Sequence, residues 1–501
     1  MGELAFENTF VRDLPADPVA DNMPRQVSGA SYTRVAPTPV AAPRLLAWSD
    51  DLGERLGIGR PDARMVEVLA GNRVLPGMQP YAARYGGHQF GHWAGQLGDG
   101  RAITLGEALA RDGTRQELQL KGAGRTPYSR TADGRAVLRS SLREFACSEA
   151  MHWLGVPTTR ALSLVATGES VVRDMFYDGN PAPEPGAVIC RVAPSFLRFG
   201  NFQIHAARNE PELLKRLVDY VMKFHFQEID TYEEFFSEVC ARTARLMVDW
   251  MRLGFVHGVM NTDNMSILGL TIDYGPYGWL EGFDTQWTPN TTDAPTLRYT
   301  YGNQAGIGQW NLARLAESLV SLIDTRHLED GLTLFADTFQ QGWNRAIARK
   351  LGLESVPDEL ASGLFNALAA AETDFTIFFR NLAVEEPSID SLKPAFYAER
   401  PADDPLASWL LNYSQQIKRE AAGPQERIAR MKQANPKYVF RNYLAVQAIE
   451  ALEQGDASVL ERLMRVLERP YDEQPEHADL AARRPDWARD RAGCSALSCS
   501  S

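Results

Sequence analysis

Two polar side chains near the middle of the chain, Asn264 and Asp273, are of the types that bind hard divalent cations. They lie on either side of a short apolar run that we expect to form a strand, and Asp273 is followed by Tyr274-Gly275. Mg²⁺ prefers carboxylate and amide oxygens together with nucleotide phosphates. The same pattern also fits two polar turns around a buried strand, so other residues have to distinguish a metal site from plain turns.

The loop before Asn264 lacks an acid that phosphoryl-transfer enzymes normally carry. Protein kinases bind metal with a catalytic-loop Asn and the Asp of an Asp-Phe-Gly triplet, and their catalytic Asp lies five residues before that Asn. Here the position is Val259, whose side chain cannot accept a proton. Asp263 is the only acidic residue in the loop, so either Asp263 is the base or the chain is catalytically inactive.

A kinase-like site also requires an upstream Lys that meets the phosphates. The runs Arg101–Ala110 and Arg115–Ala123 are separated by Asp112-Gly113, a dipeptide typical of tight hairpin turns. Lys121 lies on the second predicted strand and faces away from the neighbouring leucines. Taken alone, Lys121 is more simply explained as a solvated surface lysine.

The partner of that Lys is expected on the next helix. Apolar residues recur at helical spacing from Val137 to Trp153, and Gly155 follows as a stop signal. This helix carries Glu144 and Glu149, which point to different faces. Periodicity does not choose between them.

A glycine-rich turn, Gly95–Arg101, precedes the hairpin. Its backbone N–H groups are suited to a close approach to phosphate. Ile103 stands where a dinucleotide-binding fingerprint requires its third glycine, so this is not a Rossmann motif. His88 and His92, four residues apart, lack an obvious third ligand, and we expect them to have structural roles rather than to bind zinc.

Together these motifs resemble the selenoprotein O family of kinase-like protein adenylyltransferases, over nearly the whole chain. The resemblance is carried by Tyr32–Val35 with Pro37–Pro39, Tyr85–His92, Leu97–Ala102, Leu120–Arg130, Ala132–Phe145, His257–Gly275, Asn435–Tyr438, Arg441–Tyr443 and Cys499–Ser501.

The resemblance implies a reaction and a set of site residues. ATP would bind inverted, so that the α-phosphate faces a protein hydroxyl and AMP is transferred while pyrophosphate leaves. Asp263 would be the base, Glu144 rather than Glu149 would steady Lys121, and Mg²⁺ or Mn²⁺ would bind Asn264 and Asp273. The nucleotide contacts implied by the resemblance are Gly98, Gly100, Arg101, Lys121, Asp133, Gly134, Arg191, Arg198 and Asp273. Cys499 stands where the family's selenoprotein members have selenocysteine, which implies a redox role.

The expected fold is α+β, with two kinase-like lobes. Residues 1–80 are predicted to wrap around the lobes, residues 81–200 to form a small β-rich nucleotide-binding lobe, and residues 201–470 to form a large helical lobe that carries the catalytic loop. Residues 471–501 are expected to form a flexible, cysteine-containing tail. The pattern from Tyr232 to Leu253 predicts the helix that leads into the catalytic loop.

Amino-acid composition limits which binding partners and which cellular location we expect. A net charge of −12 argues against a general nucleic-acid surface. No apolar run approaches the roughly 20 residues that a membrane helix needs, and the first residues have neither a signal-peptide nor a transit-peptide pattern. Five cysteines in 501 residues are too few for a disulfide scaffold, and we expect Cys494 and Cys499 to be accessible in the Ser-rich tail. These observations predict a cytoplasmic bacterial protein whose partners are ATP and protein substrates, with no nucleic acid and no membrane.

Two other functions remain open. Val259 favours a non-catalytic scaffold that binds ATP without transferring anything. A kinase that transfers the γ-phosphoryl group with Asp263 as base is the second alternative. The sequence names no protein substrate, does not choose among Ser, Thr and Tyr acceptors, and leaves UTP open as a donor.

Overall fold

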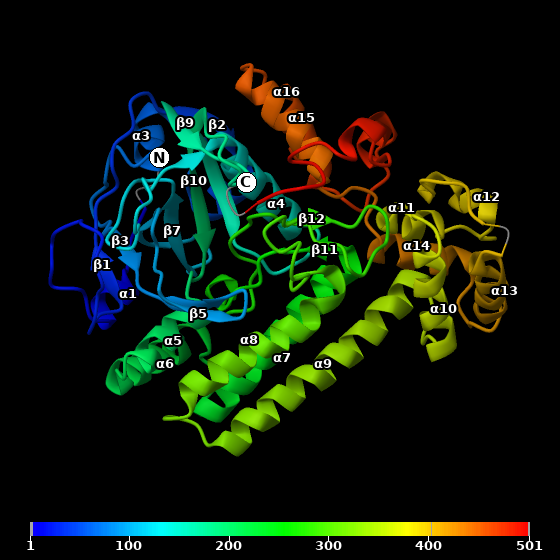
Figure 1. The fold of residues 1–501 in the computed structure, drawn as a ribbon, viewed down its shortest axis with the longest axis horizontal. Helices are drawn as coiled ribbons and strands as arrows, with labels where there is room; N and C mark the ends of the chain where they lie inside the picture. Colours follow the sequence, from blue (N-terminus) through cyan, green and yellow to red (C-terminus); the bar gives the residue numbers. More distant parts are fainter. Residues whose placement is uncertain (1–3, 402, 499–501) are drawn as a thin grey trace.

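The computed structural model describes residues 4–401 and 403–498, which form an α+β protein with a β-rich part and a helical part (Figure 1). The main sheet is antiparallel, with eight strands in the order β1-β3-β6-β7-β10-β9-β2 and with β8 paired to β10. Its strands are β1 (Tyr32–Arg34), β2 (Arg44–Trp48), β3 (Tyr81–Ala83), β6 (Ala102–Leu109), β7 (Arg115–Lys121), β8 (Ala136–Val137), β9 (Arg160–Arg173) and β10 (Ala182–Ala193).

The predicted hairpin and the helix that follows it are confirmed. Strands β6 and β7 pair with Ala102 opposite Lys121, and Gly113 in the turn has a positive φ of 78°, a conformation that glycine adopts without steric cost. Helix α4 (Leu138–Trp153) packs against β9 and β10. The hairpin and α4 therefore carry Lys121 and Glu144 on neighbouring elements.

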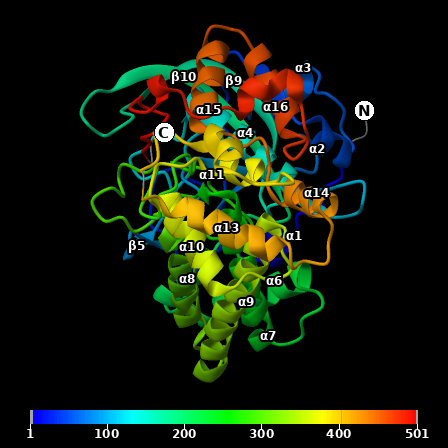
Figure 2. The ribbon, with the colours of Figure 1, turned by 90° about the vertical axis from the view of Figure 1, so that its right-hand side faces the viewer.

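The helical part begins after β10. Its elements are α5 (Phe199–Ala207), α6 (Pro211–His225), α7 (Tyr232–Leu253), α8 (Gln304–Leu319), α9 (Thr325–Leu351), α10 (Asp358–Ala369), α11 (Phe375–Asn381), α12 (Ile389–Leu392), α13 (Pro405–Ile417), α14 (Pro424–Ala434), α15 (Asn442–Glu453) and α16 (Ser458–Leu467). Helices α7, α8 and α9 pack side by side below the sheet, and α15 and α16 pack against α4 (Figures 1 and 2).

Helix α7 has the predicted bounds because both ends carry strong local signals. Thr231 and Glu234 form a reciprocal capping box at its start, and Gly254 ends it in the left-handed conformation with φ 74°. The next residues, β11 (Phe255–Val256), pair with β12 (Gly278–Trp279). The loop between these two short strands contains the candidate catalytic residues.

The strand that we expected between Asn264 and Asp273 is absent. Thr262–Asn264 form a 3-10 turn, η1, and the following residues make only isolated bridges, from Ser266 to Arg198 and from Thr271 to Thr158. Gly269 interrupts the run, since its φ is +70° and its N–H donates to the Ser266 carbonyl. Each half of the segment is therefore too short to form a ladder.

The first 80 residues contribute to the main sheet. They supply β1 and β2 of the main sheet, together with α1 (Thr9–Asp13), α2 (Asp50–Arg55) and α3 (Ala63–Leu69). Two hydrophobic clusters lie on opposite sides of the sheet, one shared with the helical part and one closed by these N-terminal segments. In the described residues, none of the helices has the length and apolar character needed to span a membrane.

Candidate active site

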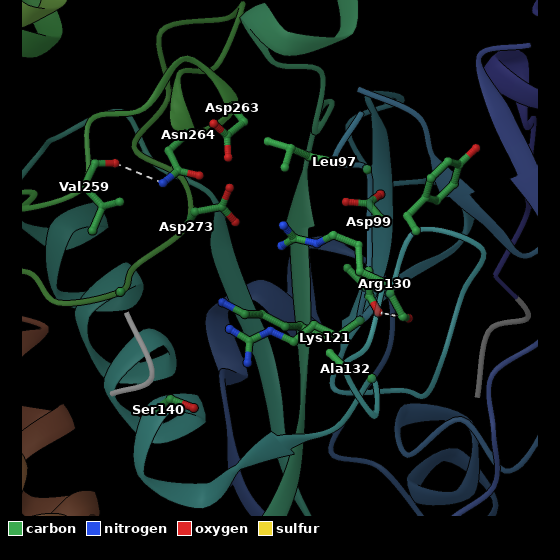
Figure 3. A pocket seen from close by; sticks show the side chains of 18 of the residues that line it. Leu97, Asp99, Lys121, Arg130, Ala132, Ser140, Val259, Asp263, Asn264 and Asp273 are labelled. Atoms are coloured by element: carbon green, nitrogen blue, oxygen red, sulfur yellow. Dashed lines mark hydrogen bonds between the residues drawn. The ribbon is translucent and has the colours of Figure 1, made fainter. Parts of the chain in front are cut away.

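A cavity of about 770 Å³ separates the main sheet from the loop that connects β11 and β12. The glycine-rich turn, β7, the loop before α4, β10 and the β11–β12 loop all contribute lining residues. Among the predicted site residues, those that line the cavity are Gly98, Gly100, Arg101, Lys121, Asp133, Gly134, Arg191, Arg198, Asp263, Asn264 and Asp273. Figure 3 shows Asp263, Asn264 and Asp273 together on one side of this cavity, with Asp99 and Arg130 on the other.

Lys121 contacts Glu144, as the family resemblance implied. The Lys121 ammonium bonds Oε2 of Glu144, and the other carboxylate oxygen accepts from Arg191 at 3.1 Å. Glu144 is buried, and burial would raise its pKa, but the charges of Lys121 and Arg191 lower it below the ordinary value. Burial lowers the pKa of Lys121 to about 7. A buried carboxylate thus holds two cations that face the cavity.

Glu149 belongs to a different cluster. Its carboxylate accepts from the Arg160 guanidinium at 2.7 Å and from the Ser49 hydroxyl at 2.7 Å. This ion pair ties α4 to β9 and to the start of α2, away from the cavity. The two glutamates, which periodicity left undecided, are separated by the tertiary structure.

Asp273 is bound by two arginines that both come from the segment around the end of β10. Its Oδ1 accepts from Arg191 at 2.8 Å, and its Oδ2 pairs with Arg198. Arg198 also donates to the main-chain oxygen of Asp263 at 2.8 Å. Asp273 itself has a positive φ of 56°, a conformation that is uncommon for residues other than glycine.

Asn264 faces the same cavity with its amide fixed. Its Nδ2 donates to the Val259 carbonyl at 2.9 Å, which leaves the amide oxygen as the group able to bind another partner. Val259 occupies the position at which a kinase has its catalytic acid. Its main-chain carbonyl, not its side chain, holds the amide of Asn264. No group of three or more His, Cys, Asp and Glu side chains suited to a metal occurs in residues 4–401 and 403–498.

Asp263 is buried, with 6% of its surface exposed. Burial raises the pKa of Asp263 to about 6. Its Oδ2 accepts from Nε2 of Gln89 at 3.0 Å, whereas its Oδ1 has no hydrogen-bond partner within the described part of the chain. A carboxylate with a pKa near neutrality in a cavity is suited to accept a proton.

His257 joins two distant parts of the loop between β11 and β12. Its Nε2 lies 2.8 Å from the Ile272 carbonyl, and its ring stacks on Trp250 of α7 with centroids 5.1 Å apart. Burial lowers the pKa of His257 to about 4, so the ring is neutral at physiological pH and donates to that carbonyl. This bond brings Asp263 and Asp273 to the same side of the cavity without the predicted strand.

The glycine-rich turn is held against the segment that follows Gly124. The hydroxyl of Thr126 donates to the Asp99 carbonyl at 2.6 Å, and Ser129 donates to the Gly100 carbonyl. Gly98 has φ +80° and packs on the ring of Tyr128, where a side chain would not fit. The turn is therefore rigid and presents its backbone to the cavity.

Asp133 and Gly134 reach the cavity from the loop before β8. Asp133 accepts two bonds from Arg173, at 2.7 and 2.8 Å, and Gly134 has φ +74° and packs against Gly124. Arg101 also lines the cavity, and burial lowers its pKa. Arg101, Asp133 and Gly134 thus all line the cavity.

Several lining residues were not singled out from the sequence. Arg130, Arg173 and Tyr177 line the cavity. Arg130 ends a quoted motif but was given no role, and Arg173 and Tyr177 lie outside the quoted motifs. Gln89 stood inside a quoted motif without a role. The ring of His88, for which the sequence predicted a structural role, packs against Trp93 and Trp310.

The cysteines differ from the expectation. Cys494, predicted to be accessible, is 4% exposed, because the main chain around it packs on the protein: its carbonyl accepts from Asn442 at 2.9 Å. Cys147, Cys190 and Cys240 are also buried. Cys499 lies outside the described residues.

Comparison with known proteins agrees with this geometry. Residues 21–468 match the family model described as protein adenylyltransferase SelO. A protein nucleotidyltransferase YdiU from Nitrosospira multiformis is 61% identical over an alignment that covers 99% of this chain and 96% of the relative. Relatives of the same name from Aromatoleum aromaticum and Methylobacillus flagellatus are 57% and 54% identical, over 100% and 99% of this chain and all of each relative. The chain therefore belongs to the SelO family of protein adenylyltransferases and is a nucleotidyltransferase.

Proposed function

We propose that this protein transfers AMP from ATP to hydroxyl side chains of other proteins. The observation that carries the proposal is the buried carboxylate of Asp263, which shares one cavity with Asn264, Asp273 and three arginine or lysine side chains held by ion pairs. Nucleotidyl transfer requires mainly positioning and neutralisation of charge, with modest proton transfer. A single acid in the loop is enough for that chemistry.

We also propose that the β-rich and helical parts correspond to the two lobes of a kinase-like fold. The hairpin with Lys121 and the helix with Glu144 lie on the sheet side, and the loop with Asp263, Asn264 and Asp273 lies on the helical side. This is the order in which kinases arrange the same functions.

The triphosphate is proposed to bind inverted, with its α-phosphate nearest Asp263. Lys121, Arg191 and Arg198 supply positive charge in the cavity, and guanidinium groups bind phosphate oxygens through two parallel bonds. The remaining proposed nucleotide contacts are Gly98, Gly100, Arg101, Asp133, Gly134 and Asp273. The support for inversion is family membership, together with Val259 at the place where γ-phosphoryl transfer has its acid.

Asn264 and Asp273 are the proposed ligands of Mg²⁺ or Mn²⁺. Both line the cavity, and an amide oxygen with a carboxylate is a donor set that fits a hard cation. The bound cation would neutralise charge on the phosphates. Asp273 would then bind the cation in place of Arg191 and Arg198. Both arginines would become available to bind phosphate.

The proposed reaction balances as follows. The acceptor oxygen forms a bond to the α-phosphorus, the bond from that phosphorus to the bridging oxygen breaks, and pyrophosphate leaves with the electron pair. The acceptor proton passes to the carboxylate of Asp263. The products are AMP joined to the protein hydroxyl and pyrophosphate.

Transfer of label from ATP tests this proposal. Label at the α-phosphate should appear in acceptor proteins, and label at the γ-phosphate should not. Asp263→Ala should lose transfer but still bind ATP, and Asp273→Ala should lose both metal-dependent ATP binding and transfer. Label delivered only from the γ-phosphate would identify a kinase, and ATP binding without any transfer would identify a scaffold. Replacing ATP with α-labelled UTP in the same assay tests the second donor.

Redox control through Cys499 and a cytoplasmic location are part of the proposal. They are supported by the position of Cys499 in the family motif and by relatives that are all bacterial. Oxidation should change the activity of the parent protein but not of Cys499→Ser. Equal responses of the two proteins would contradict redox control.

A further inference from the structure

The catalytic loop is attached to a strand that the proposed chemistry does not use. Strand β4 (Gly86–Gln89) pairs with β5 (His92–Gln96) in a separate two-stranded sheet, and it lies against η1, the turn that contains Asp263. The amide of His88 donates to the Thr262 hydroxyl at 2.7 Å, and the amide of Phe90 donates to Oδ1 of Asn261 at 3.2 Å. Between these two bonds, the side chain of Gln89 reaches Asp263.

The bond from Gln89 fixes the orientation of the Asp263 carboxylate. Nε2 of Gln89 donates to Oδ2 of Asp263 at 3.0 Å. Within the described residues, no other side chain forms a hydrogen bond with this carboxylate. The two residues are 174 positions apart in sequence. Because the carboxylate is buried, little water is available to replace a lost donor.

Gly87 makes room for the same carboxylate. A Cβ at Gly87 would lie 2.5 Å from Oδ1, 2.8 Å from Cβ and 2.9 Å from Cγ of Asp263. Gly87 is not among the residues with a positive φ, so an alanine there would meet no backbone strain. The absence of a side chain at this position is required by Asp263 and not by the local backbone.

The strand that carries these residues is itself held on α5. Nδ2 of Asn201 donates to the Arg84 carbonyl at 2.9 Å, and the Thr262 hydroxyl donates to Oε1 of Gln203 at 2.6 Å. Helix α5 thus contacts both the segment before β4 and the turn with Asp263. The carboxylate is therefore placed by two rigid elements.

We propose that Gly87 and Gln89 are positioning residues that hold the Asp263 carboxylate toward the acceptor hydroxyl, an inference that rests on the proposed role of Asp263 as base. Gln89 fixes the plane of the carboxylate by binding Oδ2, and Gly87 leaves the volume that Oδ1 occupies. Neither residue touches the nucleotide in this role. Their substitution should therefore affect turnover and leave nucleotide affinity unchanged.

Steady-state kinetics of four variants tests this inference. Gln89→Leu removes the donor, and Gly87→Ala displaces the carboxylate. Both should lower kcat by on the order of 100-fold, since a misplacement of 1 Å in a catalytic group can cost that much, while KM for ATP stays at the parent value. The matched controls are Gln340→Leu on the exposed face of α9 and Gly306→Ala on α8, where an added Cβ meets no atom within 4 Å. The controls should keep parental kcat.

Thermal unfolding separates positioning from a general folding defect. Gly87→Ala should lower Tm in the parent protein but not in an Asp263→Gly background, because every clashing atom of the Asp263 side chain, its Cβ included, is then absent. An equal loss of Tm in both backgrounds would overturn the inference, and so would parental kcat in Gln89→Leu and Gly87→Ala when Asp263→Ala is inactive. Parental transfer by Asp263→Ala would instead refute the proposed base, and the inference with it.

Discussion

At the scale of single residues, the environment of Asp263 makes the most direct prediction. Burial raises its pKa to about 6, and a general base must be deprotonated to act. We therefore expect kcat/KM to rise with pH along an acid limb whose midpoint lies near 6. Measuring α-label transfer between pH 5 and pH 8 checks this, and activity that falls as pH rises through this range would contradict it.

The same shift predicts a stability cost. The pKa of Asp263 is higher in the folded protein than the ordinary value of 3.8 for an aspartate, so the folded state loses stability as pH rises from about 4 to about 6, and the loss is complete above 6. A shift of two units corresponds to about 3 kcal/mol. Asp263→Asn should therefore be inactive yet more stable than the parent at pH 7.

Urea unfolding at two pH values measures this effect. The stability advantage of Asp263→Asn should shrink as pH falls toward 4, where the parent carboxyl is protonated. An advantage of the same size at pH 4 and pH 7 would show that ionisation of Asp263 is not its cause.

At the scale of secondary-structure elements, α4 carries two buried carboxylates with different tasks. Glu144 holds Lys121 and Arg191 at the cavity, and Glu149 holds Arg160. Glu149→Gln should destabilise the protein by less than the roughly 3–5 kcal/mol that a fully unpaired buried charge costs, because Asp51 still pairs with Arg160 at 3.0 Å. The folded variant should keep its kcat. Glu144→Gln should lower transfer activity, because Lys121 loses the charge that positions it.

Comparing both variants by thermal unfolding and by label transfer gives a two-way test. Full activity in Glu144→Gln would exclude a role for this pair in binding phosphate. A loss of kcat in folded Glu149→Gln would show that the link to β9 also positions the site.

At the scale of the whole molecule, the segment around Leu497 contacts residues that support the loop between β11 and β12. Leu497 is fully buried. Its amide donates to the Pro289 carbonyl at 2.9 Å, and its carbonyl accepts from Thr291 at 2.7 Å. Between those residues, Nδ2 of Asn290 donates to the Gly258 carbonyl at 3.0 Å. The C-terminal segment thus supports the loop that holds Asp263.

Truncation of this contact should be costly. Leu497→Ala should lower the free energy of unfolding by about 2–5 kcal/mol, as for other buried leucines. Leu411→Ala on α13, where the side chain is 66% exposed, is the control and should change stability little. Equal stability of the two variants would show that the C-terminal segment is not part of the cooperative fold.

Local patterns were the reliable part of the sequence interpretation. Periodicity predicted α7, and the turn dipeptide Asp112-Gly113 predicted the hairpin. These signals, like the caps that the structure shows at the ends of α7, act over a few residues. The strand expected before Asp273 failed because Gly269 turns the chain and each half finds only an isolated bridge. The accessibility expected for Cys494 failed because its burial depends on Asn442, 52 residues away.

The sequence by itself determined which side chains are available to the site: two carboxylates and an amide within eleven residues, and a Lys on a hairpin. Only the tertiary structure decided how they are oriented. It placed Glu144 rather than Glu149 beside Lys121, bound Asp273 to two arginines, and set Gly87 and Gln89 against Asp263. The hydrogen bonds among these contacts join residues from 23 positions apart (Lys121 and Glu144) to 174 positions apart (Gln89 and Asp263). They depend on the complete chain fold, and no local propensity encodes them.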